Sequence, residues 1–293
     1  MTQILVAALF LAFILALLSP ALQILLRKAL AERPALIFLV PAILSAFFCG
    51  IAAAISALSV SLAALILVYT FLPSMWAFWA RRAVAPAWAD FGIILLLWLP
   101  LELSVGRWWT PARAQALLHT AAYGISVTLA LTLFLLFRRL DGMKYNLPRR
   151  GRDFVNLLIG FAAVAPVLIV LGRALGFLPP FHTPARPSPF SLGTQFLVIL
   201  AGTALPEEIL FRGLIQNSLM QRFGAKTPTL LLAALIFGCA HLNNGPGPLP
   251  NWRYMILATI AGFVYGKVFQ KSSSILASAG LHALVNTIKH SFF

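Results

Sequence analysis

Acidic side chains are scarce in this sequence. Only 7 of the 293 residues are Asp or Glu, and charged residues of both signs amount to 10%. A soluble globular domain carries about 25% charged residues, so the composition excludes an ordinary water-soluble domain. Cysteines are few as well. Because Cys49 and Cys239 both lie inside apolar segments, a disulfide framework is also excluded.

Long apolar runs fill the chain instead. Hydrophobic residues make up 61% of it, and a helix of roughly 20 residues crosses a bilayer core about 30 Å thick. We therefore predict an all-α, polytopic transmembrane helix bundle with about 8 to 10 membrane spans. The candidate segments are 3–26, 34–54, 57–79, 91–104, 115–137, 154–178, 191–221, 228–242, 253–270 and 274–290.

Basic residues are far more numerous than acidic ones, with 22 Lys and Arg. Such an excess can indicate nucleic-acid binding, but that requires a basic face on a soluble domain, so we expect no nucleic-acid partner. Fifteen bases lie in alternate loops, and five, including Lys289, lie in the opposite loops or at the C-terminus. The positive-inside rule predicts that the side with fifteen is cytoplasmic. We expect a multi-pass protein of the cell membrane, in contact with membrane lipid.

The basic segment 138–153 divides the chain into two parts. Residues 1–153 form an amino-terminal transmembrane region of unknown role, almost free of buried charge, whereas residues 154–293 contain charged groups inside predicted spans. Segment 179–190 has five prolines and is predicted to be a non-helical connector, since proline lacks the backbone donor that a helix needs.

Polar residues inside the carboxyl-terminal spans are the candidates for a site. An ionisable group at membrane depth costs roughly 2.5 to 3.5 kcal/mol on insertion scales and marks a functional site by default. Three predicted helices carry such groups to overlapping depths. The first carries Glu207, Glu208 and Arg212, the second ends at His241, and the third carries His282 and Asn286.

Helical spacing predicts how these groups pair. Residues four apart share a face, so Glu208 is expected to pair with Arg212, and His282 lies one turn from Asn286. Glu207 is about 100° round the helix from Glu208 and needs another partner, for which we expect His241. Pro206 is expected to kink the helix just before the two carboxylates.

The chemistry of this set indicates a hydrolase. A glutamate next to a histidine can deprotonate water, and a second histidine with an asparagine amide can donate to a developing oxyanion. Peptide-bond hydrolysis is the natural reaction. Alternatively, Glu207, His241 and His282 could hold a divalent metal such as zinc with an open water position, although the HExxH signature is absent.

Three motifs resemble those of a known family. EEILFRG at 207–213, FGCAH at 237–241 and HALVN at 282–286 fit EExxxR with a following Gly, FxxxH and HxxxN. In this order they resemble the CAAX-protease and bacteriocin-processing (CPBP, Abi) family of intramembrane proteases, which are type II CAAX prenyl endopeptidase-like. The resemblance covers roughly 154–293.

The resemblance implies a role for each residue. Glu207 and His241 would activate the attacking water, His282 and Asn286 would form the oxyanion hole, and Glu208 with Arg212 would support the site. The family has been described both as metal-dependent and as glutamate-based, and here the amide in the set favours a metal-free mechanism. The implied substrates are peptides or membrane proteins, prenylated ones included.

Two other functions fit a polytopic chain with these groups. A proton-coupled transporter would use buried Glu and His as a relay, but it predicts polar sites in both halves of the chain. A non-catalytic membrane scaffold or immunity protein of the same fold would keep the helices without the reaction. An assay of Glu207→Gln distinguishes the scaffold from the enzyme.

Overall fold

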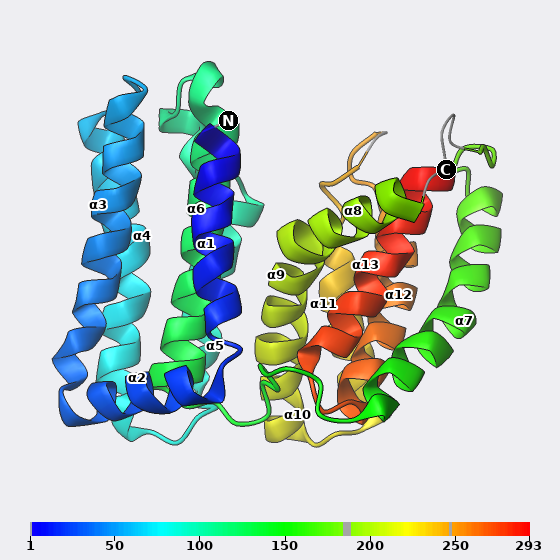
Figure 1. Cartoon of the computed structure of the whole chain (residues 1–293). Helices are drawn as coiled ribbons and strands as arrows, with labels where there is room; N and C mark the ends of the chain where they lie inside the picture. The colour runs from blue at the N-terminus through cyan, green and yellow to red at the C-terminus, as the bar shows by residue number, and fades with distance from the viewer. Residues whose placement is uncertain (1, 184–188, 246–247) are drawn as a thin grey trace. The chain divides into compact units, whose positions relative to one another are not determined.

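We describe the protein from a computed structural model, which covers residues 2–183, 189–245 and 248–293. Every regular element in these ranges is helical (Figure 1), which confirms the predicted all-α class. The chain forms two compact units, residues 1–142 and 143–293, so the division falls within the basic segment 138–153. Cys49 and Cys239 are both free thiols, as predicted.

The amino-terminal unit contains six α-helices. They are α1 (Thr2–Ala16), α2 (Pro20–Glu32), α3 (Leu39–Ala54), α4 (Val60–Trp79), α5 (Trp88–Glu102) and α6 (Gln115–Ala130), which continues as a π-helix over Leu131–Phe137. Within this unit α6 packs against α1, α3 and α5. The predicted span 3–26 is broken, because α1 and α2 meet at 88° where Ser19 caps α2 and Pro20 occupies its first turn.

The described residues of the carboxyl-terminal unit contain seven α-helices. They are α7 (Gly151–Ala174), α8 (Pro189–Ile199), α9 (Leu205–Glu208), α10 (Asn217–Phe223), α11 (Thr227–Cys239), α12 (Trp252–Lys271) and α13 (Ile275–Phe292). Helix α12 packs against α7, α11 and α13. The π-helical segments Leu200–Ala204 and Ile209–Gln216 join α8, α9 and α10. Figure 1 shows that the chain changes direction between α8 and α9, so the predicted span 191–221 is bent.

The helices are those of a multi-pass membrane protein. Among the described residues, four helical segments are long and apolar enough to cross a membrane, or five if the bent pair α1 and α2 is one span. The other predicted spans are helical too, but α11 has only 13 residues, and α12, which carries basic side chains near both ends, is not among the helices that are apolar enough. The count of eight to ten spans stays a prediction, and so does the assignment to the cell membrane.

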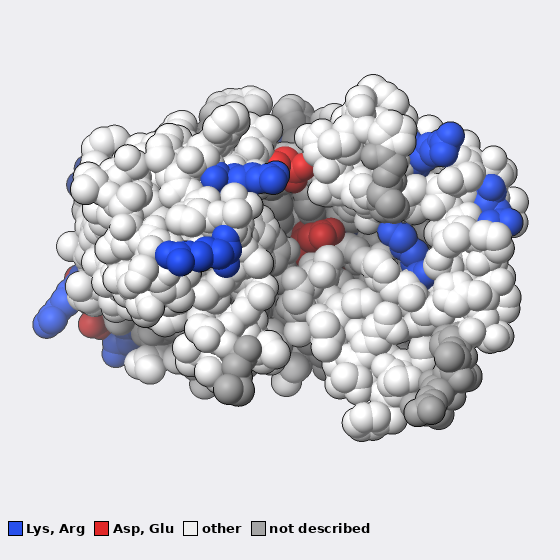
Figure 2. All heavy atoms as spheres, turned by 90° about the horizontal axis from the view of Figure 1, so that it is seen from above, with Lys and Arg blue, Asp and Glu red and all other residues white. Residues whose placement is uncertain are grey.

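The surface has the character expected of a chain in lipid. Large apolar side chains point outward along the helices, among them Ile4, Val60 and Ile159 with exposed fractions of 73%, 89% and 63%. Figure 2 shows isolated charged side chains on an otherwise uncharged face. Exposed apolar area of this extent indicates contact with membrane or protein. Residues 184–188 of the predicted connector, including the counted base Arg186, lie outside the described residues.

A buried ion pair corrects one expectation about the amino-terminal unit. The guanidinium of Arg138 donates to both carboxylate oxygens of Asp90, at 2.7 and 2.8 Å, and both side chains are almost fully buried. Asp90 also accepts from the backbone N–H of Ala87 at 2.7 Å and so caps α5. Buried charge is therefore present in both units. Arg138, which we counted among the basic loop residues of the cytoplasmic side, is buried in this ion pair.

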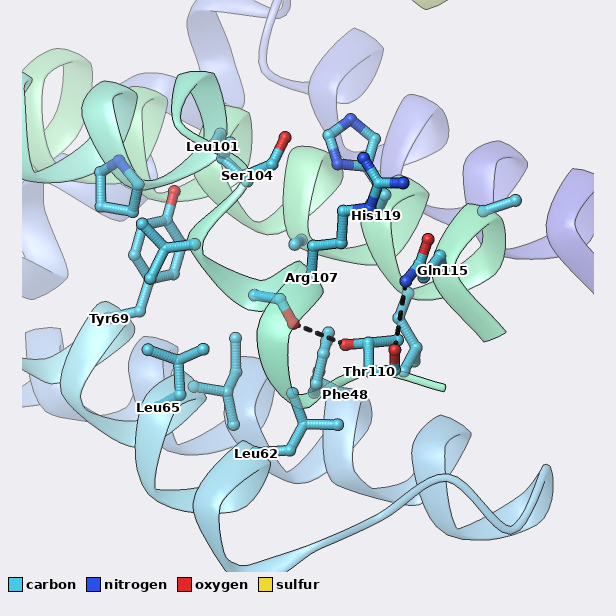
Figure 3. Close-up of a pocket in the computed structure, with 17 residues that line it drawn as sticks. Phe48, Leu62, Leu65, Tyr69, Leu101, Ser104, Arg107, Thr110, Gln115 and His119 are labelled. Atoms are coloured by element: carbon cyan, nitrogen blue, oxygen red, sulfur yellow. Dashed lines mark hydrogen bonds between the residues drawn. The ribbon is translucent and has the colours of Figure 1, made fainter. Parts of the chain in front are cut away.

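The amino-terminal unit also contains a cavity of about 320 Å³. Apolar side chains of α3 to α6, such as Phe48, Leu62 and Leu65, form most of its wall, and Arg107 and His119 are its basic lining residues (Figure 3). None of the predicted site residues is among its lining residues.

Candidate active site

The two adjacent glutamates occupy α9, a single helical turn between two π-helical segments. Pi-helical bulges interrupt regular α-helices and often mark functional sites. Glu208 is fully buried, whereas the side chain of Glu207 keeps 24% of its surface exposed. The two neighbouring carboxylates therefore have different environments, as a 100° rotation between successive helical residues requires.

Glu208 and Arg212 form the ion pair that their spacing predicts. Arg212 Nε lies 3.2 Å from Glu208 Oε2, and both side chains have no exposed surface. The angle of this contact is not that of a hydrogen bond, and the guanidinium nitrogens make none to a described residue. Instead, the guanidinium carbon lies 4.6 Å from the ring centre of Phe237 and 5.8 Å from that of Tyr265. The positive charge of Arg212 is thus stabilised by a carboxylate and two aromatic faces.

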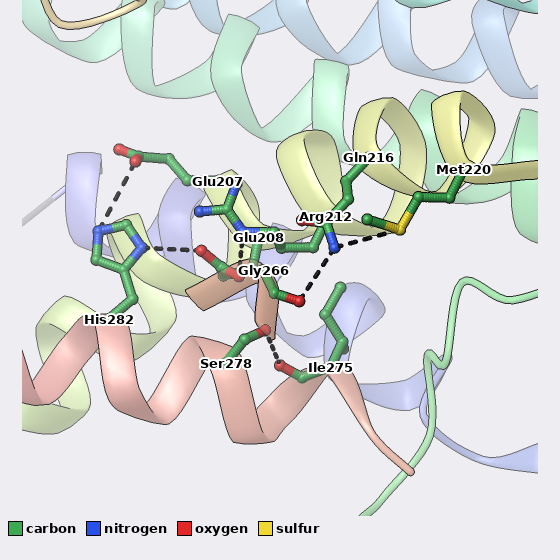
Figure 4. A network of polar contacts seen from close by, with 9 residues as sticks. All are labelled: Glu207, Glu208, Arg212, Gln216, Met220, Gly266, Ile275, Ser278 and His282. Carbon is green, nitrogen blue, oxygen red and sulfur yellow. Dashed lines mark hydrogen bonds and ion pairs between the residues drawn. The ribbon is translucent and has the colours of Figure 1, made fainter. Parts of the chain in front are cut away.

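His282 on α13 lies between the two glutamates (Figure 4). Its Nδ1 atom is 3.3 Å from Glu208 Oε1, and its Nε2 atom is 3.9 Å from Glu207 Oε2. We predicted His241 as the partner of Glu207, whereas the ring that contacts both carboxylates is that of His282. Since an ionised carboxylate can only accept hydrogen bonds, Nδ1 carries a hydrogen whenever Glu208 is ionised.

His241 follows the last turn of α11 and is buried, with 7% of its surface exposed. Its Nδ1 lies 2.8 Å from the carbonyl oxygen of Phe237. A carbonyl can only accept, so Nδ1 is the donor and Nε2 of the neutral ring is an acceptor. The rings of Phe237 and Tyr254 lie 4.7 and 4.6 Å from the imidazole, centre to centre, and fix its orientation.

A cavity of about 70 Å³ joins the second and third motifs. His241, His282 and Asn286 all line it, together with apolar residues of α7 and α12. His282 thus belongs to two sets of residues. It contacts Glu207 and Glu208 on one side, and on the other it faces the cavity shared with His241 and the half-buried Asn286.

Helix α12 supplies residues to the site that were not predicted. The ring of Tyr265 stacks on His282 with centres 4.8 Å apart and planes at 24°. A Cβ atom at Gly262 would lie 2.8 Å from Phe237 Cδ1, so this glycine allows the Phe237 ring to reach both histidines. The sequence signal was present, because Gly262, Tyr265 and Gly266 recur at helical spacing in the middle of α12.

The proposed metal ligands do not form a metal site in this geometry. Among the described residues, no group of three His, Cys, Asp or Glu side chains could hold a metal ion. His282 directs Nδ1 to Glu208, and His241 directs Nδ1 to Phe237. These contacts leave Nε2 of each ring as the atom that a metal would use, but Glu207, His241 and His282 as placed are not gathered as a zinc ligand set, and the steps proposed below use only side chains of the protein.

Fold and site together define a polytopic membrane protein with a buried glutamate–histidine cluster. Residues 189–288 match the model of the Rce1-like family, described as type II CAAX prenyl endopeptidase Rce1-like. The matched residues all lie in the carboxyl-terminal unit and contain the three motifs, which supports the resemblance to this family. No curated protein and no solved structure matches the chain.

Proposed function

We propose that the protein is an intramembrane endopeptidase that hydrolyses a peptide bond near the carboxyl end of a prenylated protein or peptide. The observation that carries the proposal is the position of His282, which contacts both glutamates and lines one cavity with His241 and Asn286. The family match supports the same reaction class. The steps below assign each of these side chains a role.

Glu207 is the general base. It is the carboxylate of the pair that keeps some exposure, so a water molecule can reach it. The carboxylate takes a proton from that water while the water oxygen attacks the carbonyl carbon of the scissile bond. His241 assists through Nε2, which is an acceptor because Nδ1 donates to Phe237. Two acceptors orient the attacking water better than one.

His282 and Asn286 stabilise the tetrahedral intermediate. Its oxyanion accepts hydrogen bonds from Asn286 Nδ2 and from Nε2 of His282, which donates when the ring is protonated. Two carboxylates and one guanidinium surround this ring, so a protonated His282 makes the cluster of Glu207, Glu208, Arg212 and His282 neutral. Removing one donor of this kind from other hydrolases costs about 10² to 10³ in kcat.

The intermediate collapses when the bond between carbon and nitrogen breaks. Glu207, now protonated, gives its proton to the leaving nitrogen, so that a carboxylic acid and an amine form and the base is restored. The acid then passes its proton to the amine, and the final products are a carboxylate and an ammonium. Glu208 and Arg212 are positioning residues in this scheme. Glu208 holds Nδ1 of His282, and Arg212 keeps the buried Glu208 ionised.

The test compares the purified full-length wild type with Glu207→Gln, using fluorogenic peptides that end in a prenylated CAAX sequence. We expect cleavage by the wild type and a loss of at least about 10² in kcat for the variant. Glu102→Gln is the matched control, because Glu102 is a partly buried glutamate in the other unit. Equal cleavage by wild type and Glu207→Gln would contradict the assigned base.

A chelator tests the metal-free form of the mechanism. We expect the wild-type rate to be unchanged after incubation with EDTA and dialysis, because the proposed steps use only protein groups. Loss of the rate, with recovery on addition of zinc alone, would show that Glu207 and the histidines act as ligands in a rearranged site.

A further inference from the structure

A lysine side chain lines the cavity of the candidate site. Lys289 on α13 borders it with His241, His282 and Asn286, and none of the described residues that line it is Asp or Glu. The Lys289 Nζ atom lies 4.9 Å from the ring centre of Phe177 and 4.6 Å from that of Tyr254. It makes no hydrogen bond or ion pair with any described residue.

A half-buried ammonium that pairs with no described carboxylate is unusual in apolar surroundings. Aromatic faces stabilise a cation by about 0.5 to 2 kcal/mol, which recovers only part of its hydration. An ammonium group also has three donors and no acceptor, so the ring contacts leave its hydrogen-bonding capacity for a ligand. The ligand that fits is an anionic group on a molecule that extends into the cavity.

The position of Lys289 along α13 defines how far the anionic group lies from His282. Lys289 follows His282 by seven residues, which places it two helical turns further along the same face, about 10 Å away. Three residues of extended peptide span roughly the same distance, at about 3.3 to 3.6 Å each. When the scissile carbonyl of a peptide faces His282 and Asn286, a group about three residues further along the peptide therefore reaches Lys289.

We propose that Lys289 binds the C-terminal carboxylate of the substrate. This inference rests on the proposed function, since it assigns a subsite of the same cavity. A CAAX sequence stands at the carboxyl end of its protein, so such a substrate has a free carboxylate three residues after the cysteine. Lys289 selects substrates that end at this distance and places the scissile bond at His282 and Asn286.

The experiment uses two prenylated peptides that differ only at the last residue, as free acid or as primary amide. For the wild type we expect kcat/KM to be about tenfold or more higher for the acid, the value of a hydrogen bond between charged groups. Lys289→Met should lower kcat/KM for the acid peptide to the value for the amide peptide. Lys289→Arg should keep the preference for the acid peptide. Lys267→Met is the matched control, since Lys267 also lies over an aromatic ring, that of Phe263, but does not line the cavity.

Each result decides one of the two proposals. Equal rates on acid and amide by the wild type would overturn the carboxylate subsite and leave the peptidase intact. A fall in both rates for Lys289→Met, with the acid preference kept, would also overturn it, because that is the effect of a structural residue. No cleavage of either peptide by the wild type would overturn the proposed function.

Binding provides a readout that does not require cleavage. The last three residues of the substrate, added as a free tripeptide acid, should raise the Tm of the wild type and of Lys267→Met. The tripeptide amide should not, and neither peptide should stabilise Lys289→Met. Equal stabilisation of wild type and Lys289→Met by the acid would overturn the subsite.

Discussion

The imidazole of His282 is held by Glu208, a carboxylate 74 residues earlier in the chain, with Nδ1 and Oε1 3.3 Å apart. The contact links the first motif to the third and orients Nε2 toward Glu207. It also explains why two glutamates stand side by side. One is buried against Arg212 and positions the histidine, and the other keeps enough exposure to meet water.

The two glutamates should differ in what their loss does. Glu208→Gln leaves Arg212 buried without a counter-charge, which costs about 3 to 5 kcal/mol in other proteins, and it should reduce both stability and activity. Glu207→Gln should abolish activity and change the free energy of unfolding by less than about 1 kcal/mol. Chemical unfolding in detergent, run beside the peptide assay, measures both. Equal destabilisation by the two substitutions would contradict the conclusion that Glu207 and Glu208 have different environments.

His282→Asn should lower kcat by about 10² to 10³, because the ring that contacts Glu208 and faces the cavity is lost. His290→Asn is the control, since His290 lies on the same helix but is exposed. The measurement is kcat on the prenylated peptide for both variants. A similar loss for His290→Asn would indicate damage to α13 rather than loss of the His282 ring.

Gly262→Ala should lower activity by displacing Phe237, since the new Cβ would lie 2.8 Å from Phe237 Cδ1 and that ring contacts both histidines. Overpacking of this kind costs about 1 to 3 kcal/mol. Gly193→Ala meets no atom within 4 Å and should be neutral or slightly stabilising. Tm and kcat of the two variants are the readouts, and equal behaviour would show that the packing at Gly262 is not needed.

Lys144→Met should destabilise the turn between α12 and α13. Lys144 Nζ donates to the carbonyls of Phe269, Gln270 and Ser272 at 2.7 to 3.1 Å, and buried carbonyls without donors cost about 1 to 3 kcal/mol. Lys28→Met is the control, because Lys28 forms only an exposed ion pair with Glu32. Unfolding free energies of both variants test the prediction, and a loss for Lys28→Met as large as that for Lys144→Met would contradict it.

The same lysine should give the stability a pH dependence. Burial lowers the pKa of Lys144 below its ordinary value of 10.5, against a smaller opposite effect of Asp153. The unfolded chain then binds more protons than the folded one in the interval just below pH 10.5. The free energy of unfolding contributed by Lys144 should therefore rise with pH across that interval. The difference between wild type and Lys144→Met, measured from pH 8 to 10.5, should show a positive slope, and a flat difference would contradict it.

The sequence by itself determined the class of the protein and the identity of its polar residues. Apolar runs predict helices because a membrane span must satisfy its backbone internally, and all ten predicted segments are helical apart from breaks and bends. The ion pair between Glu208 and Arg212 was predictable for the same reason, since residues four apart on one helix meet whatever surrounds them.

The tertiary structure alone decided contacts between residues far apart in the chain. His282 beside Glu208, Arg138 beside Asp90, and Tyr265 stacked on His282 join separate helices. The rotation of each helix about its axis and its depth against its neighbours set these contacts. Periodicity does not predict such rotation on helices that are apolar all round. Lys289 is an example. Its position at the C-terminus indicated a place outside the membrane, but it lines the cavity of the candidate active site.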